Sequence, residues 1–167
     1  GDWERFLHER NTLPDLIQCA IMHEQFEAIH PFLDGNGRLG RLLITLFLIE
    51  RGRLPQPLLY ISSYIEAHRQ DYYDLLQRVR THGDWMSWLR FFIAGVTEIA
   101  LEAVGQAGRL MDLREKFRAR LRDKAKALAL LDELFLNPYM SVSRAEHVLK
   151  VSNPTARQAV MLLQKKG

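Results

Sequence analysis

The chain has 167 residues, of which 47% are hydrophobic, and a formal net charge of +3. Such a length buries one substantial hydrophobic core, or one core and a small second module, so we expect a globular protein. The single cysteine, Cys19, excludes a disulfide within the chain, and the longest apolar run, Leu42 to Ile49, is much shorter than the roughly 20 residues of a membrane-spanning helix.

Apolar residues recur at helical spacing almost everywhere, and the alternation typical of strands is nearly absent, which predicts an all-α fold. The first long helix begins near Pro14, since proline suits a first helical turn, and ends near His30. A second helix, which we expect to be deeply buried, runs from Arg38 to about Arg51 and is ended by Gly52. A short glycine-rich loop joins the two.

The middle of the chain predicts two more helices and a charged connection. One helix covers about Ser63 to Thr81, and another runs from Asp84, a suitable N-cap, past Ala100. From Leu110 to Lys126 the charges alternate in sign, which is typical of an exposed connecting helix.

The last part of the sequence contains three short apolar segments, Leu128–Leu136, Val142–Leu149 and Pro154–Lys166. Their spacing is typical of a helix-turn-helix. The first 110 residues carry a net charge of −3 and the remainder a net charge of +6. The basic second part is compatible with binding of a nucleic acid or an acidic partner, or simply with a helix face that is exposed to solvent. We therefore expect a helical core at 1–110, a connecting helix at 111–126, and at 127–167 a helix-turn-helix that resembles a truncated winged helix.

The segment from His30 to Arg41, HPFLDGNGRLGR, gathers more chemistry than a structural turn needs. Gly35 and Gly37 allow backbone conformations in which successive N–H groups form an anion-binding nest. The helix that follows points its positive end at the same place. Both features favour a bound phosphate group.

Three kinds of side chain in this loop complement a phosphate. Arg38 and Arg41 are three positions apart, so both leave the same side of the first helical turn and can clamp phosphate oxygens with forked donors. The carboxylate of Asp34 can hold a divalent cation between phosphates, an arrangement that suits magnesium. His30 remains as a general base, since an imidazole can accept a proton near neutral pH. His23 is not at the HExxH spacing of a zinc site, and we expect it to be a packed core histidine.

These residues match the motif HPFx(D/E)GN(G/K)RxxR at every defined position, and the chain resembles the Fic family from about Phe6 to Val104. The resemblance implies that His30 deprotonates a Ser, Thr or Tyr hydroxyl of a target protein, which attacks the α-phosphate of ATP and displaces pyrophosphate. It further implies a magnesium ion on Asp34 and packing of the loop into the core by Phe32. The implied phosphate contacts are Gly35, Asn36 and Gly37 for the α- and β-phosphates, and Arg38 and Arg41 for the β- and γ-phosphates.

Two family features are not found in the sequence. Family members usually carry a flap hairpin before the motif, and many carry an inhibitory helix, (S/T)xxxE(G/N), whose glutamate pairs with the second motif arginine, here Arg41. Because the chain opens with Gly1 rather than methionine, we expect a segment upstream. The inhibitory helix belongs either to that segment or to a partner protein. The complete motif with Gly37 favours transfer of AMP over the UMP, phosphocholine or phosphoryl groups that relatives transfer.

Two other functions stay open at this point. The alternative is a DNA-binding regulator whose Fic-like core senses nucleotide or is inactive, and removal of AMP from the target is a third possibility. DNA binding would need exposed side chains on the last helix, at Thr155, Arg157, Gln158 and Lys165. Members of the family often form homodimers and lie in the bacterial cytoplasm, and we extend both expectations to this chain.

Overall fold

The structure is a computed structural model that describes residues 1–10 and 12–166. Asn11, and Gly167 at the end of the predicted 127–167 module, lie outside the described residues. Within the described residues the regular elements are all helices, so the all-α prediction is confirmed. None of the described helices is both long and apolar enough to cross a membrane. Contacts divide the chain into two compact units, residues 1–104 and 105–167, while the three-part division expected from the sequence stays a prediction.

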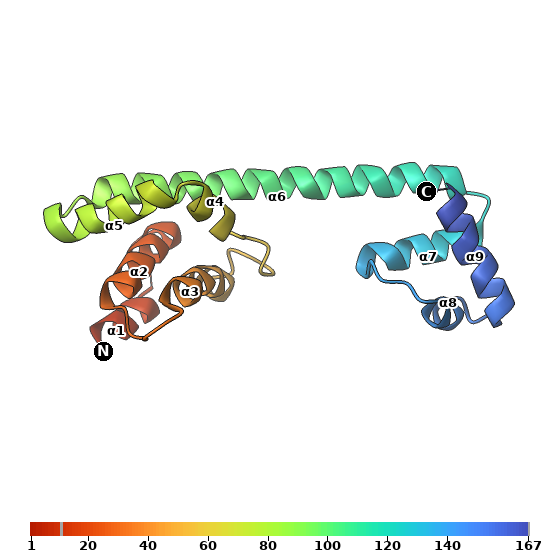
Figure 1. The fold of residues 1–167 in the computed structure, drawn as a ribbon, viewed down its shortest axis with the longest axis horizontal. Coiled ribbons are helices and arrows are strands. Elements are labelled where there is room, and N and C mark those ends of the chain that lie inside the picture. Colours follow the sequence, from red (N-terminus) through yellow and green to blue (C-terminus); the bar gives the residue numbers. More distant parts are fainter. Residues whose placement is uncertain (11, 167) are drawn as a thin grey trace. The chain divides into compact units, whose positions relative to one another are not determined.

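The first unit contains α1 (Asp2–His8), α2 (Asp15–Ile29), α3 (Asn36–Glu50), α4 (Ser62–Ala67), α5 (Arg69–His82) and the beginning of α6 (Trp85–Leu121) (Figure 1). As predicted, α2 follows Pro14 and ends at His30, whereas α3 begins two residues before its expected start. The expected deep burial of α3 is wrong. Leu42 and Leu46 on one side of it are about half exposed, while Ile44 on the other side is fully buried.

The helices α2 and α3 lie side by side (Figure 1) and approach each other closely at Gly40. A Cβ atom at position 40 would lie 2.5 Å from Oε1 of Glu27, 3.1 Å from Cε1 of His23 and 3.2 Å from Cδ1 of Phe26. A side chain at position 40 would therefore require the side chains of Glu27, His23 and Phe26 to shift, and glycine permits the close packing without such a shift.

The single helix predicted from Ser63 to Thr81 is interrupted at His68. The backbone there (φ −118°, ψ 37°) leaves the helical region, so α4 ends before it and α5 begins after it. The ring Nδ1 of His68 lies 2.9 Å from the carbonyl oxygen of Tyr64, which also accepts the N–H of His68 at 3.0 Å. The carbonyl oxygen of Tyr64 thus meets both the backbone and the ring nitrogen of His68 where α4 ends.

The core of the first unit includes Trp88 of α6, which is fully buried and lies against the rings of His23 on α2 and Tyr72 on α5. Its indole Nε1 donates a hydrogen bond to the carbonyl oxygen of Ala20 at 3.0 Å, and this bond ties α6 to α2. Cys19 is also fully buried, and its burial raises the pKa of the thiol well above the ordinary range. Since the thiolate is the reactive form, Cys19 is an inert part of the core, as expected.

The second unit contains the rest of α6 with α7 (Ala125–Leu136), α8 (Val142–Leu149) and α9 (Asn153–Lys166) (Figure 1). The prediction of three short helices here is confirmed. Ser141 caps α8, because its hydroxyl accepts the N–H of Arg144 at 3.1 Å. The helix-turn-helix interpretation of α8 and α9 stays a prediction.

The connecting helix expected from Leu110 to Lys126 is not separate from the helix before it, although most of its residues are exposed. The chain continues as α6 to Leu121, and Phe117 and Leu121 pack against Leu131 of α7. The carboxylate of Asp132 accepts hydrogen bonds from Arg114 at 2.6 Å and Arg118 at 2.8 Å. The alternating charges therefore did not indicate that this part of α6 has an apolar side, which is buried in the second unit.

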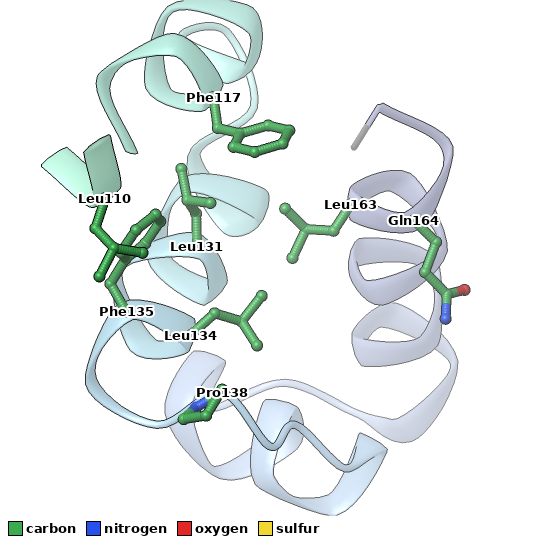
Figure 2. A pocket seen from close by; sticks show the side chains of 8 residues that line it. All are labelled: Leu110, Phe117, Leu131, Leu134, Phe135, Pro138, Leu163 and Gln164. Atoms are coloured by element: carbon green, nitrogen blue, oxygen red, sulfur yellow. The ribbon is translucent and has the colours of Figure 1, made fainter. Parts of the chain in front are cut away.

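An apolar pocket of about 580 Å³ lies between α6, α7 and α9 in the second unit. Figure 2 shows that Leu163 of α9 faces Leu131 and Leu134 of α7 across it, with Leu110 and Phe117 of α6 on the border. Gln164 supplies a polar side chain at the edge.

Alanine should have opposite effects on stability at two helical glycines, one in the contact between α2 and α3 and one on α6. We expect Gly40→Ala to lower the free energy of unfolding by about 1–3 kcal/mol, because its Cβ meets Glu27. We expect Gly108→Ala, where a Cβ on α6 meets nothing within 4 Å, to raise it by about 0.5–1 kcal/mol. Urea denaturation of both variants measures this difference, and equal stabilities would show that the helix contact tolerates a methyl group.

Candidate active site

His30 ends α2 in a left-handed conformation (φ 49°, ψ 57°), which is unusual for a residue other than glycine. Its backbone N–H still donates to the carbonyl oxygen of Phe26 at 3.0 Å. Its side chain is exposed. Backbone strain of this kind is often found at functional sites, where surrounding contacts hold it in place. Here it turns the chain away from α2 and leaves the imidazole open to solvent.

The loop after His30 is held by the side chain of Asn36, which is 2% exposed. The Oδ1 atom of Asn36 accepts the N–H of Phe32 at 3.0 Å, and its Nδ2 donates to the carbonyl oxygen of Phe32 at 2.6 Å. A buried amide that satisfies both backbone groups of one residue stabilises a single loop conformation. The resemblance implied that Asn36 holds phosphates; since its side chain serves the loop, the backbone N–H is the group that remains for a ligand.

The first turn of α3 presents free N–H groups. Gly35 precedes it with φ 82°, a left-handed conformation that favours glycine. The N–H of Leu39 is the first to bond back, to the carbonyl oxygen of Gly35 at 3.0 Å. The N–H groups of the first helical residues, Asn36, Gly37 and Arg38, have no acceptor within a helix, and they lie at its positive end. This geometry binds anions.

Asp34 and Arg38 flank this helix end in the solvent. Their side chains are 93% and 78% exposed, with Nη2 of Arg38 3.5 Å from Oδ2 of Asp34. The other carboxylate oxygen of Asp34 accepts the N–H of Gly35 at 2.6 Å. An exposed ion pair is weak, so both side chains can turn to a ligand at little cost. Among the described residues no group of three His, Cys, Asp or Glu side chains could hold a metal ion, whereas one carboxylate completed by phosphates and water suits magnesium.

Arg41 is partly buried one turn further along α3. Its Nε donates to Oγ of Ser62 at 3.1 Å, and its Nη1 lies 3.2 Å from where a Cβ on Gly37 would be. Arg38, Arg41 and Ser62 line the same hollow of about 380 Å³, together with Thr45 and Glu66. The structure thus brings the two predicted arginines to one cavity beside the helix end.

Phe32 departs from expectation. It was expected to pack the loop into the core, but its side chain is 52% exposed, and the following Leu33 is fully exposed. The hydrogen bonds of Asn36 hold the loop instead, so an apolar anchor is not required.

Comparison with known proteins finds a family match for this part of the chain. Residues 1–48, which include α2, the loop and most of α3, match the model of the Fic/DOC family. This part of the chain, which holds the complete motif, is therefore similar to the Fic/DOC family.

Several relatives of the Fic core have been described as adenylyltransferases. A probable protein adenylyltransferase of Aquifex aeolicus is 40% identical over 65 residues, which cover 39% of this chain and 20% of that protein. The protein adenylyltransferase Fic of Aedes aegypti is 41% identical over 84 residues (50% and 15%), and that of Nematostella vectensis is 38% identical over 85 residues (51% and 18%). The chain therefore spans a fifth or less of the length of these relatives.

Behind the Fic loop lies a layer of buried polar side chains. His23 is fully buried, as expected for a core histidine, and its Nε2 lies 3.0 Å from the hydroxyl of Tyr72. Glu27 is 8% exposed, and its Oε1 has no hydrogen-bond partner. Burial raises the pKa of Glu27, while the charges of His30, Arg41 and Arg80 oppose that rise. Sequence reasoning missed Glu27, although its position three residues before His30 on α2 could have drawn attention to it.

The buried His23 predicts a loss of stability in mild acid. Burial lowers its pKa to about 4 from 6.5, so the unfolded chain takes up a proton below pH 6.5 while the folded chain does not. The stability that His23 contributes is therefore complete above pH 6.5 and decreases as the pH falls toward 4. We expect a decrease of roughly 2 kcal/mol from pH 7 to pH 5, measured as the difference in unfolding free energy between the natural chain and His23→Gln. Parallel pH profiles of the two proteins would contradict the assignment.

Proposed function

We propose that the chain carries the catalytic loop of a protein adenylyltransferase, which transfers AMP from ATP to a Ser, Thr or Tyr hydroxyl of a target protein. The observation that carries this proposal is the arrangement between α2 and α3. An exposed imidazole at His30 and a helix end with free N–H groups are separated by one short loop, with Arg38 and Arg41 beside it. A base and a phosphate site in this relation suit attack of a hydroxyl on a phosphoryl group.

In the proposed reaction His30 accepts the proton of the target hydroxyl. The hydroxyl oxygen forms a bond to the α-phosphorus of ATP, and the bond from that phosphorus to the oxygen bridging to the β-phosphate breaks. Pyrophosphate leaves with the electron pair, and the target carries AMP on its side chain. The free N–H groups of Asn36, Gly37 and Arg38 would stabilise the negative charge on the α- and β-phosphates.

The charged side chains of the loop complete the proposed site. The guanidinium groups of Arg38 and Arg41 would bind the β- and γ-phosphates, since both line the hollow beside the helix end. Asp34 would hold magnesium, which neutralises phosphate charge when bound. A single exposed carboxylate next to a phosphate site fits this ion, because magnesium takes its other ligands from phosphates and water.

The names of the relatives support transfer of AMP rather than of another group. The chain spans only a small share of those proteins. The proposal therefore includes several properties only as expectations: the target protein, the modified residue, removal of AMP, a cytoplasmic location and a homodimer. It also includes, as an expectation, the location of the inhibitory helix in an upstream segment or a partner protein.

Replacement of His30 tests the base. We expect His30→Ala to abolish transfer of α-phosphate label from ATP to protein while ATP binding stays within about twofold, because the imidazole removes a proton and does not hold the nucleotide. Label retained on protein and equilibrium binding of ATP are the two measurements. His8→Ala, an exposed histidine on α1, is the matched control. Transfer at the normal rate by His30→Ala would contradict the base assignment.

Replacement of Asp34 tests the cation. We expect Asp34→Ala to lose label transfer with magnesium present, both in this chain and in a form extended upstream, because the phosphate charge is then less neutralised. Label that appears only in the extended form would show that the upstream segment is required. Equal transfer by Asp34→Ala and the natural chain would contradict the assignment of the carboxylate.

The alternative function, DNA binding, is favoured by one observation. Arg157, Gln158 and Lys165 are exposed on α9, while Thr155 is only partly so. If this helix enters a DNA groove, binding of a duplex should weaken steeply as salt rises and should fall with Arg157→Ala. Fluorescence anisotropy with a labelled duplex measures both effects, and the absence of salt-dependent binding would exclude this function for the described second unit.

A further inference from the structure

The second motif arginine, Arg41, has a hydrogen-bond partner outside the motif. Its Nε donates to Oγ of Ser62 at 3.1 Å, across 21 positions of sequence. This bond is made in a partly buried place, where it is screened less than a surface contact. Neither the motif nor the proposed reaction assigns a role to Ser62.

The fold brings Ser62 to this position by burying the segment before it. Leu59 and Ile61 are 6% and 3% exposed, and the hydroxyl of Thr45 on α3 donates to the carbonyl oxygen of Leu59 at 3.3 Å. The segment 59–61 is thus fixed along α3, and α4 begins directly after it at Ser62. Ser62 is placed by the core and not by its own hydroxyl.

The hydroxyl of Ser62 does not cap α4. The residue before α4 is Ile61, and no side chain caps this helix. The neighbouring Ser63 differs, because its hydroxyl donates to the carbonyl oxygen of Tyr60 at 3.0 Å and is exposed. Removal of the Ser62 hydroxyl should therefore leave α4 intact, and Ser63 is a matched control on the same helical turn.

The bond to Ser62 also orients the rest of the guanidinium. With Nε bound, Nη1 of Arg41 lies beside Gly37, where a Cβ would be 3.2 Å away. Oε1 of Glu27 lies 4.0 Å from the same point, so a buried carboxylate stands behind this group. The forked end of Arg41 is thus held beside Gly37 in the first turn of α3 before any ligand arrives.

We propose that Ser62 is a positioning residue for the terminal phosphates of ATP, acting through Arg41. Its hydroxyl holds the guanidinium in the orientation in which it meets the phosphates bound at the first turn of α3. An arginine fixed in advance loses less side-chain freedom on binding, so affinity for the nucleotide rises. This inference rests on the proposed function, because it assumes that ATP binds at this helix end.

A double-mutant cycle on ATP binding tests the inference. Dissociation constants for ATP with magnesium are measured by calorimetry on the full chain for Ser62→Ala, Arg41→Ala and the double variant. We expect Ser62→Ala to weaken ATP binding by about tenfold, as for a hydrogen bond to a charged group, and to cause no further loss in the Arg41→Ala background. Ser62→Thr, which keeps the hydroxyl, should restore binding, and Ser63→Ala should bind as the natural chain does.

The outcomes separate this inference from the proposed function. A natural chain that does not bind ATP, or an Arg41→Ala variant that binds it normally, would overturn both. Weaker binding by Arg41→Ala together with normal binding by Ser62→Ala would overturn only the role of Ser62. That role would also be overturned if Ser62→Ala weakened binding equally in both backgrounds, since Ser62 would then act independently of Arg41.

Discussion

The contact between α2 and α3 at Gly40 is the constraint on which the rest of the site depends. Because position 40 has no side chain, α3 packs directly against Glu27, His23 and Phe26. Two helix ends with different chemistry are thereby joined by a short loop, because α2 ends at Ile29 and α3 begins at Asn36. A helix start offers unpaired N–H groups and partial positive charge. The packing of the two helices therefore positions the helix end that we propose binds phosphate.

Burial of the polar side chains behind the loop costs free energy of folding that an apolar core would not cost. A buried carboxylate oxygen without a partner, as in Glu27, is unfavourable unless nearby charges compensate. His30, Arg41 and Arg80 are the neighbours whose electrostatic effect opposes the rise in its pKa. Arg80 also donates to the backbone carbonyl oxygen of Glu27 at 2.8 Å, which connects α5 to α2 at this level. The base and one phosphate-binding arginine of the proposed site thus share an electrostatic neighbour that the motif does not reveal.

Much of the fold could be predicted from the sequence, because helical spacing and turn residues act locally. Proline and glycine marked the ends of α2 and α3, and three apolar segments marked α7, α8 and α9. The candidate site residues could be named from the motif alone, because they are neighbours in sequence. Other features depend on particular side-chain contacts. The ring of His68 meets the carbonyl oxygen of Tyr64 where α4 ends, the side chain of Asn36 bonds both backbone groups of Phe32, and the bond from Arg41 to Ser62 spans 21 positions. Spacing alone carries no information on such contacts.

The complete burial of Cys19 makes this chain convenient for spectroscopy. Since it is the single cysteine and its thiol is inaccessible, a maleimide dye would leave the natural chain unlabelled. Leu33, which is fully exposed at the tip of the loop, can be exchanged for a cysteine that would then be the one reactive thiol. A fluorophore at that place would report on loop motion from within a few residues of the imidazole, without any need to remove other thiols first.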